Sequence, residues 1–181
     1  MKKKYLALFA IIGFCFSFSQ AADVQTETAS PSRRLIQAAR SVIYQGSSDT
    51  SCSLYVYRIM NQAGYKIGSF TANEFGWHMR NNFPYFKEKA FYAGSEAAGR
   101  GALRYFLNSA PNSTAFLAQW IRSGRYGHVA LVVKEDTDVF RIYQAQLGRA
   151  PAHSKITSIE NLLYAPNGYG DRSRLHLFYQ Y

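Results

Sequence analysis

The segment HVALVVKEDTDVFRIYQAQ, residues 128–146, contains two apolar runs rich in β-branched and aromatic residues, with an acidic stretch between them. Such runs favour extended strands, and the polar residues 135–138 are typical of a turn between two neighbouring strands. The segment therefore predicts a β-hairpin with strands over 128–133 and 139–146. Residues 174–181 alternate between apolar and polar and predict one further, closing strand.

The chain before this hairpin has a helical pattern. Apolar residues recur at helical spacing over 31–42, where Pro31 suits a first turn, and over 52–63, which Gly64 is suited to end. Helices followed by antiparallel strands predict an α+β fold, in which N-terminal helices pack on a small antiparallel sheet. Weaker patterns predict three more helices, over 72–80, 97–108 and 113–122. The later segment 151–170 is expected to be mostly loop with a single helical turn.

Length and composition limit the classes of protein to consider. The 181 residues leave room for one domain, and 48% hydrophobic with 18% charged residues excludes a disordered chain. We expect this domain to cover 31–181 after a flexible leader over 22–30, with an enlarged middle segment at about 65–124. The net charge of +10 is spread along the chain without a nucleic-acid-binding motif, so no nucleic-acid partner is expected. The four histidines are far apart in sequence, and neither a metal site nor a cofactor is expected.

Residues 1–21 have the pattern of an export signal. Three lysines, Lys2 to Lys4, precede an apolar run that ends in small residues around Ala21, as in a secretory signal peptide. The run is shorter than the roughly 20 apolar residues of a spanning helix, which makes a membrane anchor the less favoured alternative. We therefore expect cleavage after Ala21 and a protein in the periplasm or outside the cell, without stable membrane insertion.

Cleavage would remove Cys15 and leave Cys52 as the one cysteine of an exported chain, although exported proteins commonly pair their cysteines. Cys52 lies at the start of the predicted helix 52–63, where the helix dipole and unpaired N–H groups stabilise a thiolate. A thiolate is the attacking species in cysteine catalysis. The pattern leaves two interpretations of Cys52 open, a nucleophile and a small buried core residue.

His128 opens the first strand of the hairpin, directly after Gly127. A thiol nucleophile needs a base within hydrogen-bond reach, and His128 is the candidate for that base. Gln144 and Gln146 lie on the neighbouring strand and on one face of it, because side chains alternate. The amide oxygen of either can accept the imidazole N–H and orient the ring. A structural histidine and solvent-facing glutamines are the alternatives.

Five short blocks of the chain resemble, in the same order, the NlpC-type cysteine peptidases, a papain-like family of cell-wall hydrolases related to the CHAP amidases. The chain departs from the family pattern at Ser51, where the family has Asp, and at Leu54, where it has Gly. The resemblance covers residues 34–67 and 124–147 and consists of these blocks: YQG at 44–46, CSLYV at 52–56, AGY at 63–65, GHVALVV at 127–133 and IYQA at 142–145.

This resemblance implies a papain-like fold and an exported hydrolase that cleaves an amide bond in peptidoglycan stem peptides through an acyl-enzyme. The same dyad would serve an acyltransferase or a thioesterase. The departures from the family pattern also leave a catalytically inactive cell-wall binding or effector protein as an alternative. The residue roles implied by the resemblance are Cys52 as nucleophile, His128 as base and Gln144 as orienting residue, with Tyr44, Ser53 and Gly127 at the substrate site.

Overall fold

A computed structural model describes residues 29–43, 51–92, 96–121, 127–146, 149–163 and 174–181 of the chain. The expected signal peptide, most of the expected leader and Tyr44 lie outside these residues. Within the described ranges, no helix is both long enough and apolar enough to cross a membrane.

The strands of the described residues form one six-stranded sheet in the order β1-β6-β2-β3-β4-β5, and all neighbouring strands are antiparallel. The predicted hairpin is confirmed, because β3 pairs with β4 across a turn in which Asp138 has a left-handed φ of 55°. The predicted closing strand is confirmed as β6, which lies inside the sheet. The bounds are β1 (Lys87–Tyr92), β2 (Ala115–Ile121), β3 (His128–Asp136), β4 (Val139–Gln146), β5 (Arg149–Thr157) and β6 (Arg174–Tyr179).

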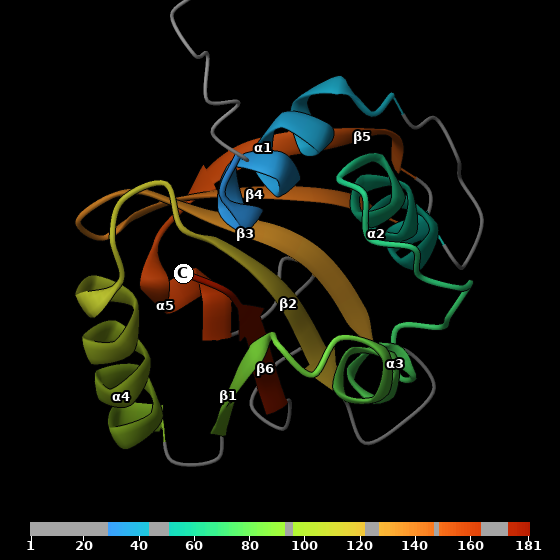
Figure 1. Cartoon of the computed structure of the whole chain (residues 1–181). Coiled ribbons are helices and arrows are strands. Elements are labelled where there is room, and N and C mark those ends of the chain that lie inside the picture. Colours follow the sequence, from blue (N-terminus) through green and yellow to red (C-terminus); the bar gives the residue numbers. More distant parts are fainter. Residues whose placement is uncertain (1–28, 44–50, 93–95, 122–126, 147–148, 164–173) are drawn as a thin grey trace, which may run out of the picture.

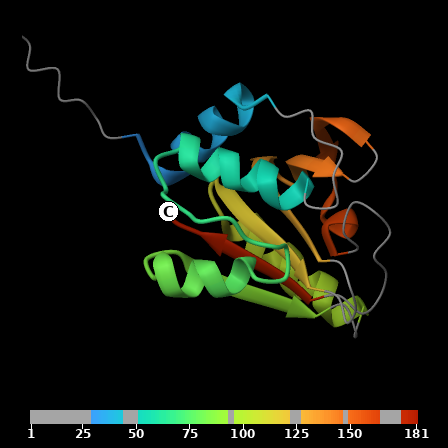
Figure 2. The same cartoon turned by 90° about the vertical axis from the view of Figure 1, so that its right-hand side faces the viewer.

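Helices cover both faces of the sheet, so the α+β class is confirmed, although the sheet is larger than expected and carries helices on its second face as well. On one face, α1, α2 and α3 form a core with side chains such as Leu117 and Leu131. On the other face, α4 and α5 form a core with side chains such as Phe116 and Val132. Figures 1 and 2 show α1 and α2 together on one side of the sheet. The bounds are α1 (Pro31–Ser41), α2 (Ser51–Gln62), α3 (Phe75–Asn82), α4 (Glu96–Ser109) and α5 (Ile159–Leu163).

The first two helices begin and end within a residue of the predicted positions, and local chemistry explains both. The Ser30 side chain accepts a hydrogen bond from the Arg33 N–H at the start of α1, which Pro31 opens. Gly64 ends α2 with a left-handed φ of 88°, a conformation that costs glycine little. The N–H groups of Gly64 and Tyr65 then donate back to carbonyls of the last turn, which closes the helix in a Schellman motif.

The helix predicted over 113–122 is wrong, because these residues contain the strand β2. Residues 115–120 are buried on both faces and pair with β3 on one side and β6 on the other. A continuous apolar run has no periodicity that separates a fully buried strand from a buried helix. The pairing partners on both sides, which the local sequence does not reveal, decide in favour of the strand.

Other differences from the predicted pattern lie at α3 and at the sheet edges. The helix α3 starts at Phe75 and not at residue 72, because the Glu74 carboxylate accepts hydrogen bonds from Thr71 N–H and Oγ1, both at 2.9 Å, and closes a turn. The expected loop 151–170 contains the end of β5 and the helix α5. The edge strand β1 was also not predicted. The strand is mostly exposed, and its Glu88 is held by an ion pair with Arg80 of α3 and a hydrogen bond with His176 of β6 rather than by an apolar pattern.

A buried hydrogen bond joins the start of α1 to the central strand. The backbone N–H of Ala115, the first residue of β2, donates to Ser32 Oγ at 3.0 Å, and both residues are buried. The helix thereby satisfies a backbone donor that has no access to water.

Replacing Ser32 with Ala leaves the Ala115 N–H without this acceptor, so we expect the free energy of unfolding to fall by about 1–3 kcal/mol. Ser41→Ala is the matched control in the same helix, because the Ser41 hydroxyl only donates to the Ala38 carbonyl near solvent; its expected change is about 0.5 kcal/mol or less. Urea unfolding followed by circular dichroism measures both. Equal losses in the two variants would contradict a special role for Ser32.

Candidate functional site

Cys52 is the second residue of α2, at the helix N-terminus that the sequence predicts. Its side chain is partly buried and packs against the core between α2 and the sheet. The Sγ atom lies 3.9 Å from Oγ of Ser53, and the side chains of Ser51 and Ser53 are buried. The thiol therefore combines a helix N-terminus with a neighbouring hydroxyl, and of the implied substrate residues Ser53 is the one beside it.

Two contacts of α1 show where the C-terminal end of α2 lies on the sheet. Arg34 donates to the carbonyl of Ala63, just beyond the C-terminus of α2, at 3.4 Å. Ser32, in the same turn of α1, holds Ala115, which pairs with the second half of β3. The C-terminal end of α2 consequently lies at the end of β3 that is distant from His128.

Tyr55, one turn after Cys52, shows where the N-terminal end of α2 lies on the sheet. Its hydroxyl donates to the Ala39 carbonyl at 3.4 Å, and burial together with the neighbouring Tyr143 of β4 raises its pKa to about 12. The first turn of α2 thus lies over β4. Since the C-terminal end of α2 is at the opposite end of the sheet, Cys52 and His128 lie at the same end.

His128 and Gln144 are both buried and are brought together by the β3–β4 hairpin. Nε2 of His128 lies 3.1 Å from Oε1 of Gln144, one of the two glutamines that the predicted hairpin places near the ring. An Nε2–H that donates to this oxygen leaves Nδ1 as the acceptor of the neutral ring. The ring also lies beside the Trp120 indole, with centroids 5.6 Å apart. The side chain of Gln146 is outside the described part of the structure.

Cys52 and His128 nevertheless pack on different faces of the sheet. Because side chains alternate along a strand, Val129 faces the core under α2, whereas His128 and Trp120 face the core under α4 and α5. Among the residues that the structure describes, no hydrogen bond joins the Cys52 thiol to the His128 ring. The structure therefore unites His128 with Gln144 and brings Cys52 to the same end of the sheet without hydrogen-bonding it to them.

Gly127 lies where the turn 71–74 approaches the start of β3. A Cβ atom at this position would be 2.4 Å from Oδ1 of Asn73 and 2.9 Å from the carbonyl oxygen of Trp120. Real side chains do not tolerate such distances, so only glycine fits without a shift of the turn. This packing accounts for Gly127 independently of a role in substrate binding.

Two residues that support this end of the sheet were missed because their segment was predicted as a helix. Gln119 is fully buried, and its Nε2 donates to the carbonyls of Ala72 and Asn73 at 2.6 and 3.1 Å, which ties the turn 71–74 to β2. Trp120 donates from Nε1 to a carbonyl of α5 at 2.6 Å. The signal available in the sequence was a lone amide inside an apolar run, which requires a specific partner once buried.

No protein-family model and no curated protein matches the chain. Within the described residues, no three His, Cys, Asp or Glu side chains are grouped so that they could hold a metal ion. The arrangement of Cys52, His128 and Gln144 is therefore the observation from which a function is argued.

The replacement Gly127→Ala is expected to lower the free energy of unfolding by about 1–3 kcal/mol, because its methyl group would overlap Asn73 and the Trp120 carbonyl. Gly101→Ala is the matched control. Gly101 lies in α4, and a Cβ atom added there would have no neighbour within 4 Å outside its own helix backbone, so alanine is expected to stabilise the protein by about 0.5–1 kcal/mol. Denaturant unfolding measures both changes, and a neutral effect at Gly127 would refute the close approach.

Alkaline unfolding tests the burial of Tyr55. Its pKa of about 12 in the folded protein exceeds the value of about 10 in an unfolded chain, so the unfolded state loses its proton first. The stabilisation is complete below pH 10 and is lost as the pH rises towards 12, by about 1.4 kcal/mol per pH unit. Tyr55→Phe is expected to lack this loss, whereas Tyr105→Phe, which removes an exposed hydroxyl, should retain it. Identical pH profiles for both variants would contradict the assignment.

Proposed function

We propose that the chain is an exported cysteine hydrolase that cleaves an amide bond in peptidoglycan stem peptides. The buried hydrogen bond between His128 and Gln144, at the end of the sheet where α2 starts with Cys52, is the observation that supports this most directly. An imidazole held by an amide oxygen has a defined tautomer and orientation, which proton transfer in catalysis requires. The proposed architecture is papain-like, with the helix of the nucleophile packed against strands β3 and β4.

In the proposed mechanism, the Cys52 thiolate attacks the carbonyl carbon of the scissile amide and forms a thioester, while the amide nitrogen leaves. His128 takes the thiol proton and passes it to the leaving nitrogen; it then accepts a proton from the water that hydrolyses the thioester. Gln144 holds the ring during both steps. The backbone N–H of Cys52, at the start of α2, donates to the oxyanion.

The mechanism requires the Cys52 thiol and the His128 ring to meet around the end of β3 when substrate is bound. The two groups lie at the same end of the sheet but on different faces of it, so this meeting requires the His128 ring or the start of α2 to move. Tyr44, Ser53 and Gly127 are the proposed substrate contacts, and Ser53 Oγ lies 3.9 Å from the thiol. An acyltransferase or a thioesterase would use the same steps with another acceptor or another acyl donor.

The packing of Cys52 and His128 on different faces favours a second candidate, a catalytically inactive cell-wall binding or effector protein. In that case Cys52 is a partly buried core residue and the His128–Gln144 pair stabilises the hairpin. The departures at Ser51 and Leu54 from the pattern of the NlpC-type peptidases agree with this candidate.

Digestion of purified peptidoglycan, followed by chromatography of the released fragments, tests the hydrolase. Cys52→Ala is expected to lower the rate of release by about 1,000-fold or more, because the nucleophile is lost. The variant should keep its circular dichroism spectrum, which separates loss of chemistry from loss of fold. Equal release by wild type and variant would rule out the proposed nucleophile.

Thiol labelling separates the two candidates. If His128 acts on Cys52, iodoacetamide should modify the folded protein near neutral pH faster than the unfolded chain, and both His128→Asn and Gln144→Leu should slow the reaction. Circular dichroism again checks that each variant is folded. A rate in the folded protein that is below that of the unfolded chain and unaffected by either variant would favour the inactive protein.

A further inference from the structure

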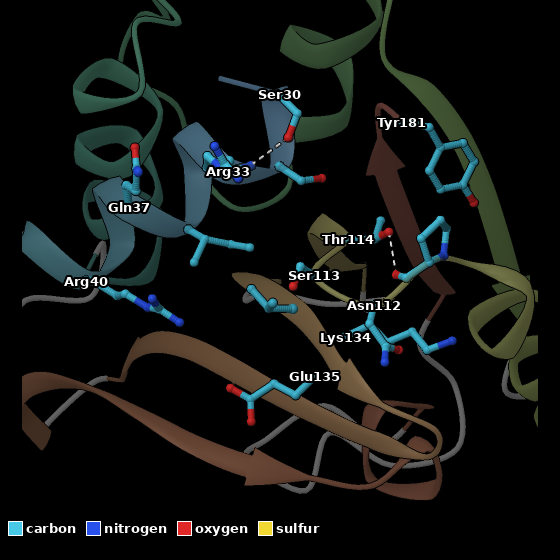
Figure 3. A pocket seen from close by; sticks show the side chains of 14 residues that line it. Ser30, Arg33, Gln37, Arg40, Asn112, Ser113, Thr114, Lys134, Glu135 and Tyr181 are labelled. Atoms are coloured by element: carbon cyan, nitrogen blue, oxygen red, sulfur yellow. Dashed lines mark hydrogen bonds between the residues drawn. The ribbon is translucent and has the colours of Figure 1, made fainter. Parts of the chain in front are cut away.

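A cavity of about 610 Å³, lined by both polar and apolar side chains, lies at the end of the sheet opposite to Cys52. Its walls come from α1, the loop 111–114, the end of β3 and Tyr181, as Figure 3 shows. This volume is within the range of sites that hold a small ligand or a short segment of peptide. Neither Cys52 nor His128 lines it, so the cavity is separate from the proposed hydrolase site.

Arg33, Gln37 and Arg40 form one wall of the cavity. Residues four and seven positions apart lie on one helix face, and a rise of 1.5 Å per residue separates Arg33 from Arg40 by about 10 Å along α1. Figure 3 shows Gln37 and Arg40 on α1 across the cavity from Glu135 of β3. Both arginines are exposed, and neither forms a salt bridge within the described part of the chain.

The remaining charged groups of the cavity are already paired. Glu135 accepts hydrogen bonds from Nε and Nη2 of Arg141. The ammonium group of Lys134 donates to the carbonyls of Asn108 and Ala110, at 2.9 and 2.6 Å, at the C-terminus of α4. Among the described residues, the lining thus presents two guanidinium groups without a carboxylate partner, and its one carboxylate side chain, Glu135, is paired with Arg141.

We infer that this cavity binds an extended acidic peptide whose carboxylates pair with Arg33 and Arg40. Guanidinium groups bind carboxylates through two parallel hydrogen bonds. In a polyproline II segment every third side chain points the same way, and such side chains are about 9 Å apart, close to the spacing of the two arginines. Gln37 lies between them and can hydrogen-bond to the peptide backbone.

Fluorescence anisotropy of the full chain with a labelled peptide of about nine residues, with Glu at every third position, tests the inference. Arg33→Gln and Arg40→Gln are each expected to weaken binding about tenfold, since each removes a charge-assisted pair. Lys66→Gln is the matched control, because it removes an exposed positive charge outside the cavity; it should change the affinity less than about twofold. The same peptide with Gln in place of Glu should bind at least about tenfold more weakly.

Cys52→Ala should bind the labelled peptide with unchanged affinity, so failure of the hydrolase proposal leaves this inference intact. Because Arg33 and Arg40 are exposed, their variants should unfold at the wild-type denaturant concentration, and this separates lost binding from lost fold. Three results would overturn the inference: no binding at millimolar peptide, equal weakening by Lys66→Gln, or tighter binding of a single-stranded oligonucleotide of equal charge.

Discussion

Helices bury both faces of β2 and β3, and the placement of nearly every functional candidate in this protein depends on that burial. A polar side chain on these strands cannot rely on bulk water and must have a partner within the protein. The amide nitrogen of Gln119 meets this condition with two carbonyls of the turn 71–74, although Oε1 of the same side chain has no hydrogen-bond partner within the described residues. Lys134 meets it with two carbonyls at the end of α4. The contact between His128 and Gln144 satisfies the same condition. It is a structural necessity as well as a potential catalytic arrangement.

The polar groups are concentrated at the two ends of the sheet. At one end, the start of β3 lies near the N-terminus of α2, and the turn 71–74 is held there by Gln119 and given room by Gly127. At the other end, the loop 111–114 and α1 enclose a cavity whose unpaired charges are positive. Because the rigid central strands separate these ends, the chemistry proposed for one does not require the other. A hydrolase and a peptide-binding surface can therefore be evaluated independently.

Local patterns were sufficient wherever a segment carries its own boundary signals. The hairpin 128–146 has two β-branched strands and a polar turn, and these predicted that His128 lies near Gln144 or Gln146; the register in the structure brings Gln144 to the ring. The helix α2 was predictable because Gly64 ends it. The strand β2 was not, since its uninterrupted apolar run suits a buried helix equally well. The edge strand β1 was missed because partial exposure leaves it without a regular apolar pattern.

The sequence by itself determined the α+β class, the position of Cys52 at a helix N-terminus and the placement of His128 near Gln144 and Gln146 of the neighbouring strand. These features follow from helix capping, from turn chemistry and from the two-residue alternation of strands, all of which act over short distances along the chain. The tertiary structure alone decided that α2 covers the face of β3 opposite to His128, and that Gly127 and Gln119 hold the turn 71–74. The alternation of side chains along a strand shows which residues share a face of the sheet. Which of the two faces a helix covers depends on the packing of the whole core.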